Sequence, residues 1–68
     1  MEKKYVLQAV TDGKRLLADF WSEDHEGWTS VHENATVYHS TAAARRARRK
    51  AKIFLPVLAD DVVVVECV

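Results

Sequence analysis

The sequence is poor in cysteine, glycine and proline, and these shortages exclude several classes of protein. Its single cysteine, Cys67, allows no internal disulfide and no zinc site built from cysteines, so an intracellular protein is expected. Gly13 and Gly27 are too few for a P-loop or a dinucleotide-binding loop. The longest apolar runs, IFLPVLA and VVVV, fall far short of the roughly 20 residues that cross a bilayer. No signal peptide is recognisable in MEKKYVLQAV, and we expect a cytoplasmic protein without membrane contact.

Length and charge set further bounds. The 68 residues are expected to form one domain, residues 1–68. A domain of this size buries only roughly 60% of its unfolded surface, so either a monomer or a homodimer is expected. Ten Lys and Arg balance ten Asp and Glu, which argues against a general polycation that coats DNA. Residues 16–44 nevertheless hold five acids and no Lys or Arg, whereas six of the eight residues 45–52 are basic.

The first part of the chain predicts a β-hairpin. KYVLQAV (4–10) and RLLADFW (15–21) alternate in the manner of strands, and the Asp-Gly pair in TDGK between them favours a reversal. Tyr5, Leu7 and Ala9 share one face, with Leu16, Ala18 and Phe20 as the matching set. Val6 and Val10 alternate equally well on the other face, so the pattern leaves the choice of core face open.

Two more strands are predicted further along. SEDHEGWTS (22–30) is acidic and rich in turn residues, which indicates a loop, and NATVYHS (34–40) is interpreted as a third strand. DDVVVVECV (60–68) is predicted as the last strand. Its unbroken valines favour burial on both faces or a central position in the sheet.

One helix is predicted between these strands. Ser40 or Thr41 provides a hydroxyl that caps it, and apolar residues then recur at helical spacing at Ala44, Ala47, Ala51, Phe54 and Leu58. Pro56 disfavours helical geometry at the residue before it, so the helix is expected to run from Thr41 to Phe54. The predicted fold is therefore α+β, in the order β-β-β-α-β, with an antiparallel sheet and one helix packed across one face.

A spacing of residues in the middle of the chain carries a resemblance. The pattern W-x6-A-x-V-Y-x-S-x-x-A-A is formed by Trp28, Ala35, Val37, Tyr38, Ser40, Ala43 and Ala44. Followed by a terminal valine strand, it resembles short α+β proteins of bacteriophages and other mobile elements. Several anti-CRISPR proteins are similar in size and in α+β make-up. The Y-x-S-x-A-A-A junction is also similar to that of some small bacterial domains. The first resemblance implies a phage-type inhibitor in the host cytoplasm, but no active site.

No catalytic or metal-binding motif appears. His25, His32 and His39 recur every seven residues, a spacing that converges only on a continuous helix, which the intervening residues do not favour. No G-x-S-x-G or Cys/His pair is present. We therefore expect neither an enzyme nor a cofactor or metal.

The candidate binding residues are the six cations of the predicted helix and one tryptophan. They are Arg45, Arg46, Arg48, Arg49, Lys50, Lys52 and Trp28. Three interpretations remain open for the cations: a solvated helix face, a docking surface for a protein, or a contact with nucleic acid. The helix lacks the Asn, Gln or aromatic residues that read bases, and zero net charge favours a protein partner. The expected function is an inhibitor, of the anti-CRISPR type, that sterically blocks a Cas effector subunit. The alternative is a small nucleic-acid-binding module that uses residues 45–52.

Overall fold

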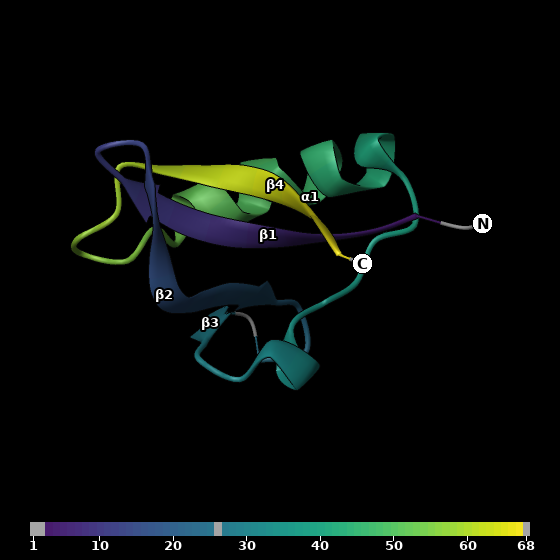
Figure 1. Ribbon diagram of the computed structural model, residues 1–68, viewed down its shortest axis with the longest axis horizontal. Helices are drawn as coiled ribbons and strands as arrows, with labels where there is room; N and C mark the ends of the chain where they lie inside the picture. The colour runs from purple at the N-terminus through teal and green to yellow at the C-terminus, as the bar shows by residue number, and fades with distance from the viewer. Residues whose placement is uncertain (1–2, 26, 68) are drawn as a thin grey trace.

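The computed structural model describes residues 3–25 and 27–67, and for residues 16–18 the description is confined to the backbone (Figure 1). The strands are β1 (Lys4–Thr11), β2 (Lys14–Ser22), β3 (Gly27–Thr29) and β4 (Asp61–Cys67), and the helices are the 3-10 helix η1 (His32–Asn34) and α1 (Thr41–Ile53). The order β-β-β-α-β and the α+β class are as predicted from the sequence.

The hairpin between β1 and β2 is confirmed. Asp12 and Gly13 have positive φ angles of 52° and 74°, the geometry of a type I′ turn, and Thr11 pairs with Lys14 on either side of it. Asn, Asp and Gly tolerate this left-handed conformation best. The Asp-Gly pair therefore sets the reversal, as the sequence indicated.

The predicted face of Phe20 is wrong. Val10 pairs with Arg15, but Gln8, two positions before Val10 in β1, pairs with Phe20, so β2 carries three extra residues at a bulge. An odd shift moves the following side chains to the opposite face. Phe20 therefore shares the face of Gln8, and Trp21 takes the face of Leu7. The side chains of Leu16 and Ala18 lie outside the described residues.

The third strand is not where the sequence placed it. Gly27–Thr29, expected in a loop, forms β3 and pairs with the end of β2, with Trp21 opposite Trp28. Residues 34–40, expected as a strand, leave η1 and form only an isolated bridge, in which Tyr38 and Tyr5 exchange two backbone hydrogen bonds of 2.8 Å. The bulged β2 turns away from β1, and Tyr38 occupies the place beside Tyr5.

The described strands form one antiparallel sheet in the order β3-β2-β1-β4. The valine-rich β4 is thus an edge strand, which corrects the expectation of a central position. Its valines alternate between two partly covered faces: Val62 and Val64 lie on the side of α1, and Val63 and Val65 lie on the opposite side. Partial cover on both faces, rather than neighbours on both edges, explains the unbroken run.

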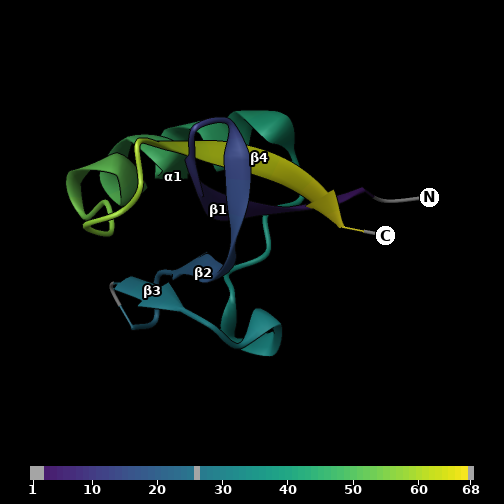
Figure 2. The same ribbon diagram turned by 60° about the vertical axis from the view of Figure 1, so that its left-hand side comes forward.

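The helix covers one face of β1 and β4, as predicted. Leu7, Trp21, Ala44, Ala51 and Val62 are fully buried between them. Alanine has the smallest apolar side chain, so α1 lies close against the sheet. Figures 1 and 2 show α1 alongside β1 and β4 in the upper part of the molecule, with β3 and η1 below them.

Candidate functional site

The position of the cations follows from how α1 is built. Ser40 begins the helix, since its Oγ accepts a hydrogen bond of 3.1 Å from the Ala43 N–H. Ala44 and Ala51 turn toward the sheet, and Phe54 closes the helix two residues before Pro56. Because the alanines hold one side of α1 against the sheet, the six cations are distributed over its remaining circumference.

Two of the six predicted cations bind the beginning of β4. Arg48 Nη2 lies 3.0 Å from Asp61 Oδ1, and its Nε donates a hydrogen bond of 2.6 Å to the carbonyl oxygen of Val62. Lys52 Nζ lies 3.1 Å from the same Asp61 oxygen. The backbone N–H of Val62, then Lys52 and Arg48, lower the pKa of the Asp61 carboxyl. These two cations therefore tie α1 to the sheet.

The other four cations remain exposed. Arg45, Arg46, Arg49 and Lys50, here called the cationic face, make no ion pair with any acid in the described residues. At 100° per residue they span about 140° of the helix circumference, away from the alanines. Four like charges this close repel one another, and a bound anionic surface would relieve that repulsion.

Trp28 is not part of this face. Its indole Nε1 donates a hydrogen bond to the carbonyl oxygen of Phe54, beyond the last turn of α1. Its ring packs edge-on against Trp21, with centroids 5.4 Å apart. Trp28 is half-buried and closes one end of the core. The structure thus separates the tryptophan from the cations with which the sequence grouped it.

The segregation of charge along the sequence is also a separation in space. Glu23 and Asp24 lie exposed in the turn after β2, and Glu33 lies exposed in η1. These segments lie near β2 and β3, at the lower end of the molecule in Figures 1 and 2, and α1 lies at the upper end beside β1 and β4. Of the other two acids of residues 16–44, Asp19 is a half-buried residue of β2 and Glu26 lies outside the described residues. A polyanion on the cationic face would therefore not meet the exposed acids of the turn and η1.

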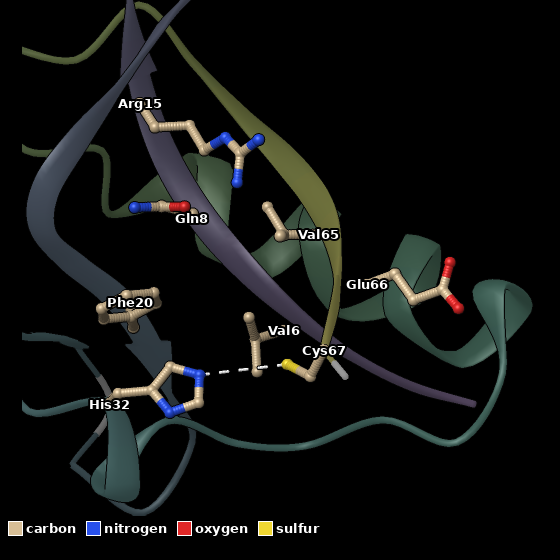
Figure 3. Close-up of a pocket in the computed structure, with 8 residues that line it drawn as sticks. All are labelled: Val6, Gln8, Arg15, Phe20, His32, Val65, Glu66 and Cys67. Carbon is tan, nitrogen blue, oxygen red and sulfur yellow. Dashed lines mark hydrogen bonds between the residues drawn. The ribbon is translucent and has the colours of Figure 1, made fainter. Parts of the chain in front are cut away.

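A pocket that the sequence did not indicate lies on the open face of the sheet (Figure 3). Its volume is about 570 Å³. The lining residues are Val6, Gln8, Arg15, Phe20, His32, Val65, Glu66 and Cys67, of which Glu66 borders the pocket while its side chain points away from it in Figure 3. Phe20 packs edge-on against His32 with centroids 5.1 Å apart, and Cys67 Sγ lies 3.9 Å from His32 Nε2. Phe20, His32 and Cys67 are far apart in the sequence, so no local motif predicts this side of the pocket.

The described residues contain no cluster suited to a metal ion. His32 and Cys67 are neighbours, but no group of three His, Cys, Asp or Glu side chains converges in residues 3–25 and 27–67. His25 lies in the turn after β2, and His39 lies just before α1. The regular spacing of the histidines does not bring them together into a metal-binding group.

Three polar side-chain atoms are buried in the described part of the chain without a well-formed hydrogen bond. Within the described residues, Trp21 Nε1, Ser22 Oγ and the Tyr38 hydroxyl make no hydrogen bond of good geometry, although Glu23 and Trp21 lie close enough to the Tyr38 hydroxyl to act on its pKa. Burial raises the pKa of the Tyr38 phenol well above its usual range, and the nearby Glu23 carboxylate raises it further. The phenol therefore stays neutral at physiological pH, and this cluster contributes no charge to a site.

No protein-family model, curated protein or solved structure matches the chain. Among the described residues, no helix is both long enough and apolar enough to cross a membrane. The candidate site therefore rests on the geometry of α1 itself.

Proposed function

We propose that this chain is a non-catalytic interaction protein that docks its cationic face on an acidic surface of a host protein complex. One observation carries the proposal: Arg48 and Lys52 have an acid partner in Asp61, whereas Arg45, Arg46, Arg49 and Lys50 have none in the described residues. Cations that serve only to stabilise the fold would be expected to have an acid partner within the chain, as Arg48 and Lys52 do. The exposed four are available to a partner.

The resemblance to small phage proteins suggests which complex this is. An inhibitor of the anti-CRISPR type would act in the host cytoplasm by occupying a Cas effector subunit, without a cofactor or a catalytic step. A surface that acts by steric occupation has to be rigid, and it requires no catalytic groups. The cap at Ser40 and the bonds from Arg48 and Lys52 to β4 supply that rigidity. Charge complementarity would steer the encounter and make it sensitive to salt.

A second function, binding to nucleic acid, is favoured by the spatial separation of charge. The exposed acids after β2 and in η1 lie near β2 and β3, whereas α1 lies beside β1 and β4, so their repulsion of a phosphate backbone on α1 would be weak (Figure 2). No Asn, Gln or aromatic side chain accompanies the four cations. Such binding would contact phosphates and be independent of base sequence.

One pair of variants separates the two functions. Arg45→Glu/Arg49→Glu reverses two charges of the cationic face, and Lys4→Glu/Lys14→Glu makes the same change of net charge at exposed positions on β1 and β2. Purified effector complexes are assayed for target cleavage with each protein. Fluorescence anisotropy with labelled duplex and single-stranded DNA at physiological salt measures the alternative.

For the proposed inhibitor, the chain reduces cleavage, Arg45→Glu/Arg49→Glu weakens inhibition by at least about tenfold, and the control pair does not. Circular dichroism establishes that both variants are folded. A folded reversal that inhibits as strongly as the parent contradicts docking through this face. Submicromolar binding of naked DNA that the reversal abolishes would instead support the nucleic-acid-binding module.

A further inference from the structure

The outer edge of β4 exposes backbone groups in a defined pattern. Tyr5 uses both its N–H and its C=O to bond Tyr38, on the side of β1 away from β4. Glu66 is opposite Tyr5 in the β1–β4 register, so its own N–H and C=O point away from β1. Backbone direction alternates along a strand, so Val64 and Val62 point outward as well.

The first of these outward residues is already capped. The Val62 N–H donates a hydrogen bond of 2.8 Å to Asp61 Oδ1, and its C=O accepts one of 2.6 Å from Arg48 Nε. This arrangement confirms independently that Val62 faces away from β1. Val64 and Glu66 have no such cap among the described residues. Within the described residues, which end at Cys67, the open part of the edge therefore consists of their four backbone groups.

An uncapped apolar edge is a site for pairing with another strand. We propose that β4 pairs with β4 of a second copy of this chain, antiparallel, to form a continuous eight-stranded sheet. The capped Val62 determines the register: Val64 of each copy lies opposite Glu66 of the other. This register uses all four open groups on each copy in four hydrogen bonds, and its two-fold axis passes between the two Val65 residues.

The charges of the two copies are complementary in this register. Glu66 is on the α1 side of the sheet and would lie next to Val64 of the second copy. Arg45 precedes Arg48 by three residues, so it occupies the same side of α1, about 4.5 Å toward the level of Val64. Each Glu66 would therefore meet Arg45 of the other copy. Within its own chain, Glu66 Oε1 lies 4.0 Å from Lys3 Nζ, which is a long contact between two exposed side chains.

The dimer would also combine the cations that Glu66 does not engage, namely Arg46, Arg49 and Lys50 of each copy. A two-fold axis perpendicular to the sheet places both α1 helices on the same side, so the two cationic faces become neighbours. The pairing itself rests on the backbone pattern of β4 and not on the function proposed above. A chain that dimerises without inhibiting any effector, or the reverse, would separate the two proposals.

Sedimentation equilibrium across a concentration series tests the dimer. The chain should approach twice its monomer mass of 7.7 kDa as concentration rises. Val65→Lys places two ammonium groups opposite each other at the axis, on the open face, and should weaken dimerisation at least about tenfold. Val57→Lys, at a fully exposed valine before β4, is the matched control and should leave the dimer unchanged.

A cross-link tests the register even if Val65→Lys fails to fold. Val65→Cys in a Cys67→Ser background places two thiols in a non-hydrogen-bonded pair, with Cα atoms about 4.5 Å apart, within disulfide range. Mild oxidation should convert it to a covalent dimer, and Val57→Cys in the same background should not. A monomer at all concentrations up to about 1 mM overturns the proposal. So does a dimer that a folded Val65→Lys leaves intact or that Val65→Cys does not cross-link.

Discussion

The side of α1 that faces the sheet and the side that faces away from it differ in how their residues find partners. Ala44 and Ala51 have no exposed surface, and their contacts come from Leu7, Val62 and the rest of the core. On the other side, Arg49 is exposed without an acid partner among the described residues, although its neighbour Arg48 bonds to β4. A rotation of 100° between consecutive residues is enough to separate a structural arginine from an available one.

The largest effect on stability is expected from a larger side chain on the side of α1 that faces the sheet. Ala44→Leu should lower the free energy of unfolding by about 1–3 kcal/mol, because three further carbons do not fit between α1 and the sheet. Ala47→Leu should cost less, since Ala47 is only half-buried. Urea unfolding followed by circular dichroism measures both. Ala42→Leu, at an exposed position of the same helix, should be close to neutral, and a neutral Ala44→Leu would contradict a closed interface.

A smaller effect is expected where a cation bonds to the sheet. Arg48→Met keeps an apolar stem but removes the guanidinium, which leaves the Val62 carbonyl and the Asp61 carboxylate without that donor. The expected loss of stability is about 1 kcal/mol. Arg49→Met changes the neighbouring position and should stay within about 0.5 kcal/mol of the parent. Equal effects of the two substitutions would erase the distinction between the two sides.

These differences show which parts of the structure local patterns were able to predict. The turn at Asp12 and Gly13, the cap at Ser40 and the end of the helix near Pro56 depend on neighbouring residues, and all three are confirmed. The bulge in β2 shifts the register by three residues without a Gly or Pro to mark it, so Phe20 was assigned to the wrong face. The position of β3 depends on that bulge.

The candidate site was predictable to the same degree. The alanine spacing identified the cations as a group on the outer side of the helix. It did not separate Arg48 and Lys52 from the others, because their partner Asp61 lies beyond the helix, on β4. The contact of Cys67 with His32 spans 35 residues and has no local signal. Contacts between distant segments are set by the sheet register, and the bulge altered that register.

The smallest effect on stability is expected from a change of pH, which acts on the contact between α1 and β4. The pKa of Asp61 is lower in the folded chain than its ordinary value near 4, since the Val62 N–H, Lys52 and Arg48 favour the carboxylate. The contribution of Asp61 to stability is therefore complete above about pH 4. It is lost as pH falls through the folded pKa, because the unfolded chain takes up the proton first.

Urea midpoints measured between about pH 6 and pH 2.5 should show this loss, and Asp61→Asn should flatten the curve in that range. Asp24→Asn is the control, because Asp24 is an exposed turn carboxylate that has no ion pair within the described part of the chain. It should leave the slope unchanged. The effect should be small because Asp61 is half-exposed and salt screens it, so the slope should decrease further at high ionic strength. If Asp24→Asn flattened the curve as much as Asp61→Asn, the carboxylate that binds α1 would be no different from one in open solvent.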